Sequence, residues 1–574
     1  RSMSALTLIS FLFFTGLVAF ISWWKTRTER LDTNTGYFLG GRSLSGVVIA
    51  GSLLLTNLST EQLVGMNGQG FSAGLAVMGW EVTSGFTLVL MALVFLPRYL
   101  RGGISTVADF LEKRYDAGTR NLIAGLFLIS LGAIFLPTVL YSGALALDQL
   151  FGIQAVFGVS QSTALVLMVW AIGIIGGIYA IFGGLKAVAI SDTVNGIGLI
   201  IGGLLIPILG LIKLGEGSIT TGMHTLVNVH PEKLNAIGDA QSPVPFGTLF
   251  CGIMLINIFY WCTNQAIVQR TFGAKNLAEG QKGVLYAGFL KIFGPLILVI
   301  PGIIAFHLYP DDVLKPDFAY PVLVAKILPT YLIGFFGAVL FGAILSSFNS
   351  ALNSASTLFA LNLYRPIFNP EIKDKDLVRV CKIFGTLLAI FSMLVAPYIA
   401  HAPDGLFAFM KKFMGFFNIP TLIVILVGFF TARVSAFAAK ATIALYMLLY
   451  GTFQFVFPVD MSFLYLLGIL FAVCTVFMLI VGKLKPHTEA YVQEVAGGID
   501  MTPWKWAWEV SALAVIAMVA VYALFSPWGL IAPVEERAGN VWTIAIVSVI
   551  ATAAALFACA KKRATKGSAH SDVF

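Results

Sequence analysis

The chain has 574 residues, of which 58% are hydrophobic and only 11% are charged, and its formal net charge is +8. A soluble domain carries roughly 25% charged residues, so most of this surface does not face water. The five cysteines are scattered without Cys-x-x-Cys or Cys/His spacing, which predicts free thiols and no metal site of that kind. We therefore expect one all-α membrane domain, without a soluble catalytic or nucleic-acid-binding domain.

Apolar stretches long enough to cross a bilayer recur along the whole chain. About 20 apolar residues span the hydrocarbon core as a helix, which predicts about 15 transmembrane helices here. The runs Leu199–Leu211 and Leu466–Ile480 are apolar without the alternation typical of barrel strands. The expected helices cover residues 4–24, 44–71, 75–97, 120–152, 163–182, 190–214, 246–273, 281–307, 327–360, 377–400, 405–432, 434–456, 460–482, 504–526 and 540–560.

Lysine and arginine residues orient these helices, because basic residues favour cytoplasmic loops. With the N-terminus outside, clusters such as Lys25–Arg30, Arg98–Arg101, Arg270–Lys282 and Lys561–Lys566 all fall on the cytoplasmic side. A wrong helix count would reverse this bias partway along the chain, and the bias does not reverse. We expect a multi-pass protein of a bacterial-type inner membrane, with the N-terminus outside and the C-terminus inside.

Two of the expected helices are interrupted by polar residues at membrane depth, where polar groups are costly and usually functional. The interruptions are Thr56–Gln62 in the second helix and Tyr260–Gln265 in the seventh. A polar seam between packed helices is the alternative for the first block. However, six polar residues in seven positions favour an unwound helix whose free carbonyls can bind a cation.

The spacing of the two interruptions predicts an inverted repeat of five plus five helices, because such repeats place broken helices at corresponding positions of their two halves. One helix precedes the repeats and about four follow them. The expected units are 1–43 (first helix and linker), 44–214 (first repeat), 215–245 (external loop), 246–432 (second repeat), 433–560 (accessory helices) and 561–574 (basic cytoplasmic tail).

Further polar residues lie inside the expected helices. Glu81 and Lys291 can offset each other's charge and offer the acceptors and donors that a polyhydroxylated ligand needs; a purely structural ion pair is the alternative. Ser346 and Ser347 can add hydroxyl oxygens to a sodium site, since hard cations prefer such oxygens, although small residues also serve as packing contacts. Asp192, at the start of the sixth helix, is either an N-cap or a cation-release site.

These motifs resemble the sodium:solute symporter family. The resemblance rests on Thr56–Gln62, Gly183–Val188, Asn257–Thr271 and Ser346–Ala355, which occur in that order within residues 36–482. The branch that the motifs resemble most is that of the sodium/glucose and sodium/galactose cotransporters. The resemblance therefore implies a LeuT-type fold and sugar import coupled to Na⁺ by alternating access.

The resemblance also implies roles for individual residues. Sugar contacts would come from Asn57, Gln62, Glu81, Ser84, Asn257 and Lys291. Met66 and Trp80 would line the outer side of the site, and Tyr260 with Trp261 the inner side. Sodium would bind the carbonyls of Leu55, Leu58 and Ala343 and the hydroxyls of Ser346 and Ser347. Asp192 matches an acidic residue that assists sodium release.

One position departs from the sugar transporters of this family. Counting back from Pro420, their sugar-binding Gln of the eleventh helix corresponds to Lys412 here. Lys412 can donate to a sugar hydroxyl, favour an anionic sugar, or extend outward to water. Sialic acid, a carboxylate or inositol therefore remain alternative solutes.

Two other functional classes are weighed against a transporter. An ion channel or sensor fits the paired helix breaks less well than a closed site at mid-membrane does. An intramembrane enzyme would need a nucleophile with its base or a metal motif such as HExxH, which does not occur. We therefore expect no enzyme. The expected partners are Na⁺, a small sugar and the lipid bilayer, with no nucleic acid.

Overall fold

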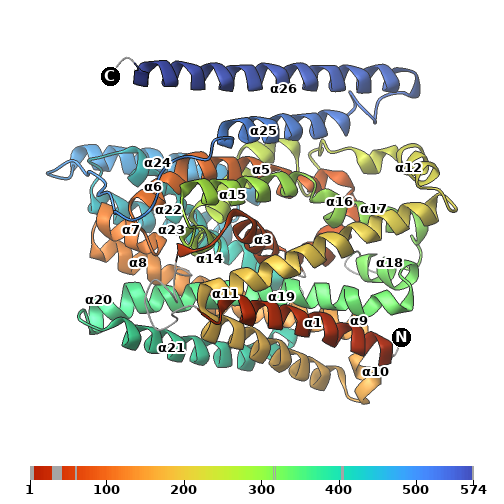
Figure 1. Cartoon of the computed structure of the whole chain (residues 1–574), viewed down its shortest axis with the longest axis horizontal. Helices are drawn as coiled ribbons and strands as arrows, with labels where there is room; N and C mark the ends of the chain where they lie inside the picture. The colour runs from red at the N-terminus through yellow and green to blue at the C-terminus, as the bar shows by residue number, and fades with distance from the viewer. Residues whose placement is uncertain are drawn as a thin grey trace.

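The computed structural model describes residues 5–28, 42–58, 61–313, 316, 319–401 and 406–571. Helices make up the regular elements of these ranges, as the composition predicted. Figure 1 shows long helices lying side by side, with α1 beside α11 and α19 and with α26 along one edge, next to α25. The main helices outside the functional site are α1 (Ala5–Thr26), α7 (Val107–Arg114), α8 (Ala117–Leu128), α9 (Leu136–Phe151), α12 (Ile219–Asn228), α18 (Ala319–Ile327), α21 (Asp374–Val395), α23 (Ala436–Gly451), α24 (Phe463–Leu484), α25 (Ala507–Leu524) and α26 (Val534–Ser571).

Twelve helices of the described residues are long and apolar enough to cross a bilayer, or thirteen when one bent pair counts as a single span. The bent pair joins α15 (Leu277–Ile292) to residues 295–308. The two other expected spans are the interrupted second helix and α22 (Leu406–Phe430), whose segment Met414–Phe430 is a shorter apolar helix. The number of about 15 spans and their orientation stay predictions.

α11 (Gln161–Leu214) joins two expected spans in one helical element. Three contacts with α19 (Thr330–Leu358) trace its path: Gly176 lies against Phe348, Asn195 against Gly342, and Gly202 against Phe335. A helix rises about 1.5 Å per residue. A straight α11 would therefore separate Gly176 from Asn195 by much more than the distance between their partners in α19, Phe348 and Gly342. α11 must therefore fold back between these contacts, and the expected helices 163–182 and 190–214 are its two arms.

Both predicted helix breaks are present. α3 (Gly46–Asn57) ends at Asn57, the following Leu58 has an extended backbone, and a π-helical turn at Glu61–Met66 leads into α4 (Asn67–Ala73). In the second case α13 (Gly252–Ile258) passes through a π-helical turn, Phe259–Thr263, to the extended Asn264. The Asn264 side chain then caps α14 (Gln265–Phe272) by accepting a hydrogen bond from Ala266 N at 3.0 Å.

The eighth expected helix has a bend that the sequence analysis did not predict. α15 ends at Ile292, and the chain continues through α16 (Pro295–Leu298) and α17 (Ile300–Leu308) at an angle of 47°. Pro295 has no N–H to continue the α15 hydrogen-bond ladder. At Gly294, an added Cβ would lie 2.8 Å from Glu81 Oε2. A glycine next to the bend therefore lets the backbone approach this carboxylate.

Candidate functional site

A buried ion pair links the third and eighth expected helices. Lys291, in the last turn of α15, donates to Glu81 of α5 (Gly79–Leu90) with an Nζ–Oε2 distance of 2.8 Å. Its side chain is 1% exposed and that of Glu81 is 3% exposed. Lys291 Nζ also donates to Asn57 Oδ1, at the end of α3. The sequence predicted this meeting of charges, and the structure adds that the broken helix takes part in it.

Asn257 comes to the same region from α13. Its Nδ2 donates to Thr83 Oγ1 at 2.6 Å and to the Trp80 carbonyl at 3.3 Å. Ser84 Oγ donates to that same carbonyl at 2.8 Å. Asn257 is therefore oriented by α5, and the sequence analysis did not identify Thr83, its closest partner.

Aromatic groups of the second break lie beside the ion pair, and an amide of the first break has an unused acceptor. Gln62, in the π-helical turn after Leu58, has an enclosed Oε1 atom with no hydrogen-bond partner among the described residues. Trp261 is fully buried and lies under the Lys291 ammonium, 5.5 Å from the ring centre. Tyr260 packs edge-on against Trp261 with ring centres 5.0 Å apart. The Gln62 oxygen is thus an acceptor that a solute hydroxyl can use.

The outer-gate candidates lie on the two helices that carry these groups. Met66 ends the π-helical turn and is buried, whereas Trp80 of α5 is half-buried. Trp80 packs with Val244 and Leu249 from the end of the expected external loop and the start of the next span. The side chain of Lys412 lies outside the described residues, so its place relative to the site stays a prediction.

The predicted sodium residues meet where the break in the second helix contacts α19. Ser347 Oγ donates to the Thr56 carbonyl at 3.1 Å, and Ser346 Oγ lies 3.4 Å from Thr56 Oγ1. Leu55 is in the last turn of α3, Leu58 follows it, and Ala343 lies one turn before Ser347. The Thr56 carbonyl and the hydroxyls of Thr56, Ser346 and Ser347 therefore lie close together, and such neutral oxygens fit a hard monovalent cation. The carbonyls of Leu55, Leu58 and Ala343 stay predicted ligands.

Asp192 lies next to these hydroxyls, inside the second arm of α11. Its Oδ2 accepts hydrogen bonds from Ser52 Oγ at 3.2 Å and from Thr56 Oγ1 at 3.3 Å. Arg270 of α14 lies 3.5 Å from the same oxygen and also donates to Ser350 Oγ. Residues on both sides of Asp192 are helical, and the hydrogen bonds that its Oδ2 accepts in the described structure come from side chains. The helix-cap alternative for Asp192 is therefore wrong.

Arg270 and Thr56 are the groups at this site whose importance the sequence analysis missed. Arg270 was counted among the cytoplasmic loop residues, but its side chain is 1% exposed and pairs with Asp192. Thr56 connects Asp192, Ser346, Ser347 and Ser350 through its hydroxyl and carbonyl. The available signal was that both residues belong to the polar blocks used for the family resemblance.

The comparisons with known proteins agree with this geometry. Residues 37–445 match the model of the sodium:solute symporter family. The chain belongs to that family. Members of the sodium:solute symporter family are transporters, and this membership supports Na⁺ as the coupling ion.

Two relatives place the chain within the sodium:solute symporter family. An uncharacterised symporter of Escherichia coli strain K12, YidK, is 50% identical over 527 residues, which is 92% of each chain. The sodium/glucose cotransporter of Vibrio parahaemolyticus is 30% identical over 461 residues, or 76% of this chain and 82% of that protein.

A solved structure shows the fold of this sodium:solute symporter. The substrate-bound, outward-open state of a Na⁺-coupled sialic acid symporter superposes with a TM-score of 0.72. The match covers 85% of this chain and 99% of the other at 19% identity. At that identity the likeness concerns the fold alone, which is the expected LeuT-type fold.

Proposed function

We propose that this symporter imports a neutral, polyhydroxylated solute of sugar size, glucose- or galactose-like, together with Na⁺. Transport would proceed by alternating access across a bacterial inner membrane. The solute would bind between the two helix breaks, at Asn57, Gln62, Glu81, Ser84, Asn257 and Lys291, with Lys412 as a further contact. Met66 and Trp80 would close the outer side and Tyr260 with Trp261 the inner side.

The neutralised ion pair is the observation that supports a neutral solute. With Lys291 Nζ 2.8 Å from Glu81 Oε2, the buried pair has no net charge. A carboxylate, an ammonium and the amides of Asn57, Gln62 and Asn257 together offer both donors and acceptors. Sugar hydroxyls donate and accept, so they match this mixture. A simple anion would instead place a second negative charge near Glu81.

Sodium would bind the carbonyls of Leu55, Leu58 and Ala343 and the hydroxyls of Ser346 and Ser347, with Asp192 assisting its release. A cation at this junction would hold the broken α3 against α19, because both helices supply its ligands. At about 100 mV, one Na⁺ entering the cell gains about 2.3 kcal/mol. Tenfold solute accumulation needs about 1.4 kcal/mol, so one ion suffices for modest uptake.

An acidic sugar is the second candidate. The solved neighbour with the shared fold is a sialic acid symporter by its description, and Lys412 replaces the Gln of the sugar branch. An acidic solute would need a basic side chain whose charge is not already neutralised. The charge of Lys291 is neutralised by Glu81. Lys412 would supply such a side chain. The two candidates therefore differ in whether binding depends on the charge of Lys412.

Solute uptake by proteoliposomes tests this proposal. Purified protein is reconstituted with an inward Na⁺ gradient or an equal K⁺ gradient, and labelled glucose, galactose, myo-inositol and N-acetylneuraminate are offered separately. We expect uptake of a neutral solute under the Na⁺ gradient alone. Uptake of that solute should persist in Lys412→Gln.

Two results would contradict the proposal in different ways. Equal uptake under both gradients would remove sodium coupling. Uptake of N-acetylneuraminate alone, lost in Lys412→Gln, would replace the neutral sugar with an acidic one and leave sodium coupling intact.

A further inference from the structure

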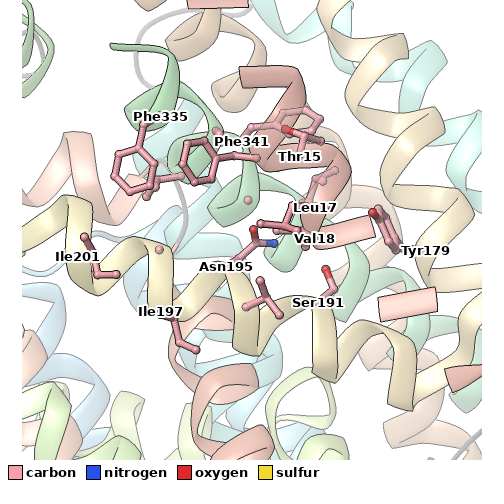
Figure 2. A pocket seen from close by; sticks show the side chains of 17 residues that line it. Thr15, Leu17, Val18, Tyr179, Ser191, Asn195, Ile197, Ile201, Phe335 and Phe341 are labelled. Atoms are coloured by element: carbon pink, nitrogen blue, oxygen red, sulfur yellow. The ribbon is translucent and has the colours of Figure 1, made fainter. Parts of the chain in front are cut away.

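A cavity of about 190 Å³ lies between α1, α11 and the first half of α19. Figure 2 shows its lining, with Phe335 and Phe341 on one side and Asn195 and Ser191 opposite Leu17 and Val18. Most lining side chains are apolar. An engineered cavity of about 150 Å³ with apolar walls stays dry and binds benzene, so this one is large enough for a molecule of that size.

The cavity is open to the bilayer interior. Leu17 of α1 and Ile197 and Ile201 of α11 line it and are also 40%, 56% and 59% exposed. The helical segments that carry them, Ala5–Thr26 and Val188–Leu214, are both long and apolar enough to cross a membrane. A ligand would therefore enter from the hydrocarbon region and not from water.

Two lining residues also place polar atoms in this mainly apolar cavity. Thr15 Oγ1 is enclosed and has no hydrogen-bond partner among the described residues. Asn195 contributes an amide that can donate and accept, and it lies against Gly342, where a Cβ would come within 2.7 Å of the amide carbon. An orphaned hydroxyl in an apolar site costs free energy, which a ligand with a hydrogen-bonding group would recover.

An ordinary acyl chain does not supply such a group at this depth. Thr15 is near the middle of the 22-residue helix α1, and hence near the middle of the hydrocarbon core, about 15 Å from either interface. Lipid ester groups lie at the interfaces, so a lipid tail would present only methylene groups to Thr15 and Asn195.

The cavity also adjoins the sodium residues along the chain. Ser191 precedes Asp192, Gly342 precedes Ala343, and Leu345 precedes Ser346. The lining residues and the predicted sodium residues therefore lie on the same turns of α11 and α19, with consecutive side chains pointing about 100° apart. A molecule wedged between α1 and these turns would favour one spacing of the helices that hold sodium.

We propose that this cavity is a regulatory site for a small neutral molecule that dissolves in the bilayer. The molecule would be mainly apolar, of the size of a substituted benzene, and would carry one hydroxyl or carbonyl group. The group would bond to Asn195 and Thr15, and occupancy would change the affinity for Na⁺ through α11 and α19.

Fluorine NMR of the full chain in lipid nanodiscs tests the site, with 4-fluorobenzyl alcohol as the probe. Gly198→Leu fills the cavity, because Gly198 lines it and a Cβ there meets only Val339 at 3.8 Å. Gly16→Leu is the matched control, since Gly16 lies on α1 next to two lining residues but has nothing within 4 Å. We expect saturable probe binding in wild type and in Gly16→Leu, and none in Gly198→Leu.

A second pair of measurements tests the polar part and does not depend on the folding of Gly198→Leu. 4-Fluorotoluene lacks the hydroxyl and should bind wild type at least about fivefold more weakly, as expected for one lost hydrogen bond of about 1 kcal/mol. The double variant Thr15→Val with Asn195→Leu should bind the two probes equally. Equal binding of both probes to wild type would make the occupant a plain hydrocarbon such as an acyl chain, and would overturn the proposed ligand class.

The regulatory part is tested by sodium titration calorimetry in the same nanodiscs. Saturating 4-fluorobenzyl alcohol should shift the dissociation constant for Na⁺ about fivefold or more, the low end of ordinary allosteric coupling. Gly16→Leu should show the same shift and Gly198→Leu should show none. A shift that persists in Gly198→Leu would come from the bilayer and would contradict regulation through this cavity.

Discussion

Two buried ion pairs lie at the centre of this symporter, and they are built differently. Lys291 and Glu81 are 2.8 Å apart, and the ammonium has Asn57 as a further acceptor. Arg270 and Asp192 are 3.5 Å apart, and Nη1 of Arg270 has no hydrogen-bond partner among the described residues. Asp192 instead shares its Oδ2 with the hydroxyls of Ser52 and Thr56.

The difference suggests distinct tasks for the two pairs. In the compact pair, Lys291 and Glu81, each charge already has the other as its hydrogen-bond partner. A solute must therefore replace hydrogen bonds of both residues to bind between them. The looser pair, Arg270 and Asp192, belongs to a network of hydroxyls that reaches Ser346 and Ser347 through Thr56. Hydroxyls can turn from a carboxylate to a cation at little cost, because their hydrogens rotate. Variants that separate solute binding from sodium binding test this division.

Glu81→Gln should have the largest effect, because it leaves the Lys291 charge buried without its carboxylate. Breaking a buried pair by removing one partner costs about 3–5 kcal/mol. We expect solute uptake to fall at least about 100-fold and the unfolding temperature to drop, while the Na⁺ dissociation constant in calorimetry stays close to wild type.

The double variant Glu81→Gln with Lys291→Gln distinguishes a solute site from a structural pair. Without either charge, the thermal stability should recover because no unpaired charge stays buried. Solute uptake should not recover. If uptake returned together with stability, the pair would serve only the fold, which is the alternative that the sequence left open.

Ser347→Ala should act on sodium and leave the compact pair intact. The variant removes one hydroxyl ligand and its 3.1 Å bond to the Thr56 carbonyl. At about 2 kcal/mol for a hydrogen bond or ligand contact to a charge, the Na⁺ half-saturation constant for uptake should rise about 30-fold.

Ser356→Ala is the matched control for Ser347→Ala. Ser356 is buried in the same helix, but its hydroxyl bonds to the Leu352 carbonyl of that helix. Sodium dependence should not change in this variant. Similar losses in both variants would point to packing of α19 and would remove Ser347 from the sodium site.

The fold followed from the sequence where one physical rule dominated. Polar blocks at membrane depth predicted the breaks near Leu58 and Asn264, because so many adjacent polar residues fit an unwound helix better than a seam between packed helices. The two arms of α11 were expected as separate helices, whereas the bend after Lys291 was not expected. This bend occurs at Gly294 and Pro295, and neither residue type says how far a helix changes direction.

The site was predicted less completely than the fold. Glu81 and Lys291 could be paired from the sequence because isolated charges are rare inside membrane helices. Thr83 could not be found this way, since a threonine in a helix usually bonds to its own backbone. Arg270 was misplaced because it lies near a helix end, where a basic residue ordinarily indicates a cytoplasmic loop.

Arg270→Lys tests the looser pair with a smaller expected effect. Arg270 contacts Asp192 and Ser350 through the same atom, Nη2. A lysine keeps the charge, but its side chain is shorter and its ammonium is not held in the guanidinium plane, so we expect one of the two contacts to be lost. Loss of one such bond, about 1.5 kcal/mol, should change the Na⁺ half-saturation constant about tenfold. Solute half-saturation measured at saturating Na⁺ should not change. An effect on solute affinity alone would place Arg270 with the compact pair.

Thr83→Val should give the smallest effect, confined to the solute. It removes the acceptor 2.6 Å from Asn257 Nδ2, while the bond from Asn257 to the Trp80 carbonyl remains. A loss of about 0.5–1 kcal/mol predicts a two- to fivefold higher KM for uptake with unchanged maximal rate. Thr87→Val, one turn further along α5, is the control, because Thr87 Oγ1 donates only to the Ser84 carbonyl of its own helix at 2.9 Å. A rise in KM that both variants share would reflect the packing of α5, whereas a rise specific to Thr83→Val would make Thr83 a positioning residue for Asn257.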